Sequence, residues 1–271
     1  MNITVNQKEF WDFLHNEINL DSYEFKFLRS KLNRIHSKKS VLYSESLLNR
    51  SNNGWVLVLL SDSIMVHGSN WSEAQLNEVL SMIDLSRFKN YLIEGNTELI
   101  KDLLKQTKIT SQIIEKERIF YLLDKVNLNS IESHSIGFPN PSDIPSIAPM
   151  LKQYYHEEYK GRYDKSVSEM ETKVEEFIST NSLYILKNPD SEIVSFCTIL
   201  DPDIGILFTV EKHRNKGYGS LVLNYCSNKL LGKNNEVFLM TDKNDVASKA
   251  TCKKVGFKSF FEYSYLRINN S

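Results

Sequence analysis

The chain has 271 residues, of which 41% are hydrophobic, 25% charged and 11% aromatic. These values are those of an ordinary folded protein and exclude extended disorder, a collagen-like chain or a coiled coil for the whole sequence. With 33 Lys and Arg against 34 Asp and Glu, the net charge of -1 provides no overall attraction for nucleic acid or anionic membranes, so we expect neither as a partner.

The three cysteines, Cys197, Cys226 and Cys252, form no C-x-x-C pair and are too few for a disulfide scaffold or a cysteine zinc site. The histidines form no H-E-x-x-H motif, and we predict no metal site. The first residues lack the basic stretch and apolar run of a secretory signal, and the longest apolar run, 55–60, is far shorter than a bilayer requires. We therefore expect a cytoplasmic protein with reduced thiols.

The first half predicts alternating strands and helices. After a helical stretch, two apolar runs at 55–60 and 64–67 flank a Ser-Asp-Ser turn and predict a hairpin. Ser72 and Gln75 form a capping box for the helix that follows. The remaining elements are a strand at 91–94, a helix from Thr97 and a strand at 119–123. This order indicates an α/β unit.

A group of prolines separates the two halves. Four of the six prolines are Pro139, Pro141, Pro145 and Pro149. Because proline lacks an amide donor and restricts the residue before it, this region should not continue a helix or an inner strand. We predict an N-terminal α/β domain at 1–130 and a second domain at 131–271.

The second half begins with two helices, one near 147–158 and one capped by Ser166 and Glu169. Short turns join the next three strands, which predicts an antiparallel meander over 183–187, 193–200 and 204–210. The last elements are a helix at 217–231, a strand at 237–241, a helix at 246–255 and a strand at 260–268. The predicted fold class is α/β (α+β), with a mixed, mostly antiparallel sheet flanked by helices.

Two of only ten glycines, Gly217 and Gly219, lie between a predicted strand and a predicted helix. Glycine allows a tight turn, and a helix N-terminus attracts negative charge, so this pattern is typical of a pyrophosphate site. The segment is neither a P-loop nor a Rossmann fingerprint, since Val222 stands where the latter needs a small residue. Taken alone, the two glycines also fit an ordinary helix start.

The stretch from Arg214 to Gly219 reads R-x-x-G-x-G and resembles the acyl-CoA loop of the GNAT acetyltransferases. A second GNAT motif, roughly T-D-x-x-N-x-x-S-x-x-x-Y-x-x-x-G-[FY], is matched at Thr241, Asp242, Ser248, Gly256 and Phe257. It is not matched at two positions, where Asp245 replaces the Asn and Cys252 replaces the Tyr. The resemblance covers about residues 131–271.

The resemblance implies a GNAT-like fold for this region, with acetyl-CoA as co-substrate. It implies that the strand end at Thr209 and Val210 aligns the pantetheine arm and that the backbone of the next loop holds the pyrophosphate. The loop residues are Arg214, Asn215, Lys216, Gly217, Tyr218, Gly219 and Ser220, and the second motif adds Thr241, Asp245 and Ser248.

Acyl transfer to an amine needs a proton acceptor and, in many relatives, a tyrosine that protonates the departing thiolate. Glu158 is the candidate base because it shares a helix face with Leu151 and Tyr154, although glutamates on helix surfaces are usually only solvated. Cys252 stands at the tyrosine position and is either the candidate acid or a small packing residue. Substitute hydroxyls are offered by Tyr218, Tyr263 and Tyr265.

The resemblance implies an N-acetyltransferase that transfers an acetyl group from acetyl-CoA to a primary amine of a small molecule or protein. The change at Cys252 leaves a second hypothesis, a catalytically inactive acyl-CoA-binding or regulatory module. A third is a tandem protein in which 1–130 is a degenerate GNAT copy without R-x-x-G-x-G, forming acceptor-pocket walls or a dimer surface. The acceptor and the oligomeric state, a homodimer included, stay open.

Overall fold

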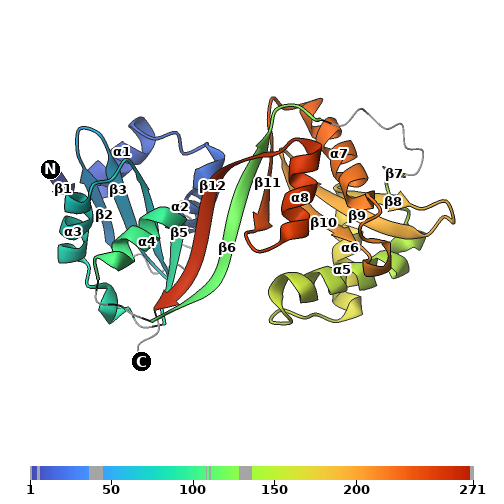
Figure 1. Cartoon of the computed structure of the whole chain (residues 1–271), viewed down its shortest axis with the longest axis horizontal. Coiled ribbons are helices and arrows are strands. Elements are labelled where there is room, and N and C mark those ends of the chain that lie inside the picture. The colour runs from blue at the N-terminus through green and yellow to red at the C-terminus, as the bar shows by residue number, and fades with distance from the viewer. Residues whose placement is uncertain are drawn as a thin grey trace. The chain divides into compact units, whose positions relative to one another are not determined.

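The computed structural model describes residues 2–4, 7–36, 45–88, 90–107, 109, 111–127 and 136–268. They form two compact units (Figure 1). The first unit holds Met1–Phe120, Thr241–Asn244 and Phe260–Ser271, and the second holds Tyr121–Met240 and Asp245–Ser259. The predicted boundary at residue 130 lies outside the described residues.

The last strand differs from the predicted division into 1–130 and 131–271. Most of β12 (Lys258–Ile268) belongs to the first unit, where it pairs antiparallel with β5 (Leu92–Asn96). The pairing runs from Tyr263 opposite Asn96 to Arg267 opposite Leu92. Hydrogen bonds between strands this far apart in the chain leave no local sequence pattern. The prediction therefore placed β12 in the domain 131–271, with the elements that precede it in the chain.

The first unit is a sheet covered by helices on both faces. Its sheet order is β1-β2-β3-β4-β5-β12-β6, in which β4 and β5 run parallel. Its elements in chain order, apart from β5 and β12, are β1 (Asn2–Thr4), α1 (Gln7–Asn16), α2 (Lys26–His36), β2 (Glu45–Arg50), β3 (Trp55–Leu60), β4 (Ile64–Ser69), α3 (Glu73–Met82), α4 (Thr97–Lys105) and β6 (Gln112–Leu123). The predicted hairpin at 55–67 is confirmed by the antiparallel β3–β4 pair.

Alternation along β3 explains the two layers of helices. Successive side chains of a strand point to opposite faces. Val56 and Val58 pack in the core formed with α3 and α4, whereas Leu57 and Leu59 pack in the core formed with α1 and α2. Because both faces are covered, β3 is apolar along most of its length.

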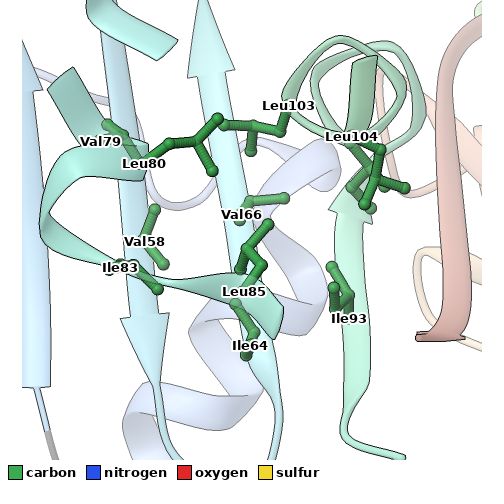
Figure 2. A pocket seen from close by; sticks show the side chains of 11 residues that line it. Val58, Ile64, Val66, Val79, Leu80, Ile83, Leu85, Ile93, Leu103 and Leu104 are labelled. Carbon is green, nitrogen blue, oxygen red and sulfur yellow. The ribbon is translucent and has the colours of Figure 1, made fainter. Parts of the chain in front are cut away.

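A small cavity lies inside the core that α3 and α4 cover (Figure 2). Its eleven lining side chains are all aliphatic, and they come from β3, β4, β5, α3, α4 and the turn at 83–85. A ligand site needs a few convergent polar groups to orient its ligand. This cavity has none and is a gap in packing.

The second unit has the sheet order β11-β10-β9-β8-β7, with β10 and β11 parallel and the other pairs antiparallel. Its elements are β7 (Ile136–Gly137), α5 (Ile144–Tyr159), α6 (Val167–Ser179), β8 (Leu183–Lys187), β9 (Ile193–Leu200), β10 (Asp203–Thr209), α7 (Tyr218–Leu231), β11 (Val237–Asp242) and α8 (Val246–Val255). The predicted meander and the predicted α/β class, a mixed sheet flanked by helices, are confirmed.

The same order of elements occurs twice in the chain. A strand, two helices, three strands, a helix, a strand, a helix and a strand run from β1 to β6 and again from β7 to β12. In each half the strands on either side of the third helix pair in parallel, β4 with β5 and β10 with β11.

None of the helices in the described part of the chain is long and apolar enough to cross a bilayer.

Candidate active site

Strands β10 and β11 of the second unit are paired at one end and then part. Asp203 opposite Phe238 is the one residue pair that joins them in the described part of the chain. Beyond it, Gly205 is exposed and Ile206 and Leu207 are half-buried, although β10 is an inner strand. The edge of β10 that faces β11 therefore keeps backbone groups without a partner in the ladder.

The chain turns sharply between β10 and α7. A 3-10 turn at Glu211–His213 is followed by Asn215 at φ 61° and Gly217 at φ 86°. Gly217 is the N-cap residue of α7, and a Cβ atom built on it would meet no atom within 4 Å. The left-handed backbone explains the glycine, and the space around it leaves the start of the helix open.

No side chain among the described residues caps α7. The first N–H groups of a helix have no partner within the helix, and the helix dipole adds positive charge there. The amides of Tyr218, Gly219 and Ser220 are in this position, beside the exposed Asn215 and Lys216. The start of α7 is therefore suited to bind an anion such as a pyrophosphate.

The equivalent turn of the first unit is closed by its own side chains. There α3 is capped by Ser72, whose Oγ accepts a hydrogen bond from the Gln75 N–H at 3.3 Å. The Gln75 side chain fills the turn, because its Oε1 accepts from the Ser72 N–H and its Nε2 donates to the Gly54 carbonyl at 3.2 Å. The turn at 69–72 contains no glycine. Of the two equivalent positions, only the one in the second unit is open.

The side chain of Arg214 ties the loop to α5 and to the end of β10, and its contact with CoA stays a prediction. Its Nη2 lies 2.9 and 2.8 Å from the two carboxylate oxygens of Glu157 on α5, and its Nε donates to the Thr209 carbonyl at 3.0 Å. The guanidinium also lies 5.5 Å from the centre of the Phe208 ring. Sequence reasoning chose Arg214 for the CoA site but missed Glu157, because no local pattern links two residues so far apart in the chain.

The loop is also tied to the turn between β8 and β9. His213 Nε2 lies 3.2 Å from Glu192 Oε2, and Lys212 forms an ion pair with the same carboxylate. The hydrogen bond from Lys212 is the main reason that the pKa of Glu192 is lowered, and His213 adds to it. No local sequence pattern indicates Glu192 as a partner of this loop.

The predicted pantetheine contacts at Thr209 and Val210 involve groups that already have partners. The Thr209 carbonyl accepts from Arg214, and the Val210 N–H donates to the Val194 carbonyl at 3.0 Å. The Thr209 hydroxyl lies 2.9 Å from Ser195 Oγ, which itself donates to the Phe208 carbonyl. Backbone groups without a ladder partner lie earlier in β10.

Two residues of the second predicted motif form a helix cap. Ser248 donates its N–H to Asp245 Oδ1 at 2.9 Å and its hydroxyl to Asp245 Oδ2 at 2.6 Å, which fixes the first turn of α8. Thr241 is buried near the end of β11 and belongs to the first unit. The geometry gives Asp245 and Ser248 a structural role, and their contact with CoA stays a prediction.

Cys252 is a buried residue of α8, with 2% of its surface exposed. Burial, followed by the charge of Asp245, raises the pKa of its thiol to about 12. Such a thiol keeps its proton at neutral pH, but transfer to a departing thiolate of ordinary pKa, about 8.5, is uphill. The structure thus weighs against Cys252 as the acid and agrees with a packing role.

The other candidates differ in burial and in their partners. Glu158 is half-buried on α5, one residue after the partner of Arg214. Tyr218 is the half-buried first residue of α7, with its ring centre 6.1 Å from that of His213. Tyr263 is completely buried in the first unit and donates to Glu94, which excludes it as a substitute acid.

Among the residues with described positions, no group of three His, Cys, Asp or Glu side chains is placed to hold a metal.

Comparison with known proteins assigns the fold. Residues 186–266 match the family model described as FR47-like protein, and no curated protein matches the chain. The GNAT-family acetyltransferase from Colwellia psychrerythraea has a TM-score of 0.54 at 12% identity, over 100% of both chains. The GCN5-related N-acetyltransferase from Sphaerobacter thermophilus has a TM-score of 0.54 at 12% identity, over 83% of this chain and 81% of that chain.

The chain has the GNAT fold. This confirms the predicted resemblance of the second half, since the matched residues 186–266 contain both parted strands and the open start of α7. The match over the whole chain of the Colwellia protein includes the first unit as well. At 12% identity these likenesses establish the fold and not the reaction.

Proposed function

We propose that the second unit is an N-acetyltransferase that takes the acetyl group of acetyl-CoA and transfers it to a primary amine of a small molecule or protein. One observation carries the proposal: the uncapped start of α7, with Gly217 at φ 86°, follows the parted strand β10. The equivalent turn of the first unit is filled by Gln75, which supports a single CoA site and a degenerate first copy.

The residues of this loop fit acetyl-CoA. Amides of Tyr218, Gly219 and Ser220 at the positive end of α7 would hold the pyrophosphate, and Gly217 leaves room for it. Bound acetyl-CoA would supply a thioester whose carbonyl carbon is attacked by the amine. The unpartnered edge of β10 would hold the pantetheine arm, because the amide groups of this arm can form hydrogen bonds with a strand edge.

Two adjacent glutamates of α5 are assigned different tasks. The amine of the acceptor must lose a proton before it attacks. We assign the role of proton acceptor to Glu158, which is half-buried. Glu157 keeps the loop in place through Arg214.

We expect Glu158→Gln to lower kcat about 100-fold with little change in the KM for acetyl-CoA, because a lost general base typically costs this much. Glu157→Gln should instead raise the KM for acetyl-CoA and leave kcat within about threefold, because it weakens a half-exposed ion pair that positions the loop. Steady-state kinetics of the two variants provide the measurement. Equal effects of both variants on kcat would remove Glu158 from the proposed role.

Cys252→Ala tests whether the thiol donates a proton. Because the thiol is 2% exposed and its pKa is raised to about 12, we expect kcat to stay within about threefold of the native value. Cys226→Ala, which removes a completely buried thiol from α7, is the matched packing control. A loss of about 100-fold in kcat for Cys252→Ala alone would make Cys252 the acid after all.

The proposal as a whole is tested by thiol release from acetyl-CoA across a panel of primary amines, together with calorimetric binding of CoA. We expect binding and release of thiol with at least one class of amine. Tight CoA binding with no turnover on any amine would instead favour an inactive acyl-CoA-binding module, the alternative that the burial of Cys252 supports.

A further inference from the structure

A bulge interrupts the pairing of β9 with β10. Ile204 pairs with Ile199 and Leu207 pairs with Cys197, so two residues of β10, Gly205 and Ile206, lie opposite the single residue Thr198. An extra residue of this kind bends its strand and leaves its backbone groups out of the ladder. The bulge begins two residues after Asp203, where the pairing of β10 with β11 ends.

The side chain of Thr198 holds this bulge from the β9 side. Its Oγ1 accepts a hydrogen bond from the Ile206 N–H at 2.6 Å, so the hydroxyl takes the place of a carbonyl of the ladder. A Cβ atom on Gly205 would lie 2.5 Å from the same oxygen, which leaves space only for glycine. Thr198 is 2% exposed, and its hydroxyl is held in one place by the surrounding core.

We propose that Thr198 is a positioning residue for acetyl-CoA, which fixes the bent edge of β10 that receives the pantetheine arm. The inference rests on the proposed function. It follows from the place of the bulge: the bend parts β10 from β11, and this bend is held by one hydroxyl on the neighbouring strand. In this proposal Thr198, which is 2% exposed, acts through the bulge and not through contact with the ligand.

This role separates the two ends of the CoA molecule. The pyrophosphate loop begins after Thr209 and has its own supports in Glu157 and Glu192, which do not involve Thr198. Loss of the Thr198 hydroxyl should therefore weaken binding of the pantetheine part and leave binding of the nucleotide part unchanged. Simple destabilisation of the fold would weaken both.

The experiment compares calorimetric binding of CoA and of 3′-phosphoadenosine 5′-diphosphate, which lacks the pantetheine arm. We expect Thr198→Val, which keeps the shape but loses the hydroxyl, to raise the Kd for CoA about tenfold and leave the Kd for the nucleotide within twofold. Thr198→Ser keeps a hydroxyl and should bind both like the native protein. Gly205→Ala, at an exposed position, pushes on the bulge from the other side and should show the same selective loss.

Unchanged CoA binding by both Thr198→Val and Gly205→Ala would overturn the inference. Equal weakening of CoA and nucleotide binding in these variants would also overturn it, because a structural role then suffices. If Thr198→Val does not fold, Gly205→Ala alone tests the inference, by whether it weakens CoA binding and leaves nucleotide binding unchanged. Failure of the native protein to bind either probe would count against the proposed function itself, a result that the native protein alone provides.

Discussion

Gly217→Asp is expected to weaken CoA binding by at least about 100-fold, whereas Gly217→Asn should weaken it by about tenfold at most. Both residues tolerate a positive φ, as Asn215 at φ 61° shows in the same turn. They differ in charge, and a carboxylate about 4 Å from a phosphate costs on the order of 4 kcal/mol at an effective dielectric constant of about 20. Calorimetric titration with CoA gives the two affinities.

The same pair of variants controls for effects on the free protein. Gly217 lies at φ 86°, so Asp and Asn carry similar backbone strain there, and both should lower the melting temperature without ligand by a similar amount. A larger loss of binding in Gly217→Asp than in Gly217→Asn therefore cannot be attributed to unfolding. If Asp and Asn weaken CoA binding equally, the start of α7 does not bind the pyrophosphate.

Lys31→Met is expected to lower the free energy of unfolding of the first unit by about 3–5 kcal/mol. Lys31 is 7% exposed, and its Nζ donates to Asp62 and Ser63 and lies 3.5 Å from Glu94 Oε1. Glu94 is also 7% exposed and accepts from the Tyr263 hydroxyl at 3.2 Å. Removal of the lysine leaves the Glu94 carboxylate buried without a cation, which is the costly arrangement.

Urea unfolding of matched variants separates the buried charge from the loss of an ordinary lysine. Lys101→Met removes a half-exposed lysine that pairs with Glu98 on the same helix, and it should cost less than about 0.5 kcal/mol. Glu94→Gln added to Lys31→Met should restore much of the lost stability, since it removes the unpaired charge. A Lys31→Met variant as stable as Lys101→Met would contradict this account.

The effect of Lys31 should also depend on pH. Burial alone would raise the pKa of Asp62, but the hydrogen bond and charge of Lys31 outweigh it and hold the pKa below its usual value. A carboxyl with a lowered pKa stabilises the fold above its unfolded pKa, about 3.9, and this contribution is lost as the pH falls through the lower folded pKa. The contribution of Asp62 to the difference between native protein and Lys31→Met should therefore shrink below about pH 4.

Local patterns in the sequence predicted many elements correctly. The capping boxes of Ser72 and Ser166 begin α3 and α6 as expected, because the residues that make a cap lie within one turn of each other. Helix α7 spans Tyr218–Leu231, against a prediction of 217–231. Strand β2 (Glu45–Arg50) was missed, since its alternation of polar and apolar residues is short and weak.

The site was predicted less completely than the fold. The glycine loop was found because its backbone conformation restricts the residue type locally: a positive φ and an open helix start both favour glycine. Glu158 was predicted as the base, whereas the contact of Glu157 with Arg214 was not predicted. That contact joins residues 57 positions apart, so no local pattern indicates it.

The sequence by itself determined most of the strands and helices, the glycine turn before α7 and the resemblance to GNAT acetyltransferases, because these depend on residues close together in the chain. Only the tertiary structure decided that β12 pairs with β5, that Gln75 closes the first copy of the turn, and that Thr198 holds the bulge in β10. These features arise from hydrogen bonds between distant residues, whose partners are selected by packing of the whole sheet.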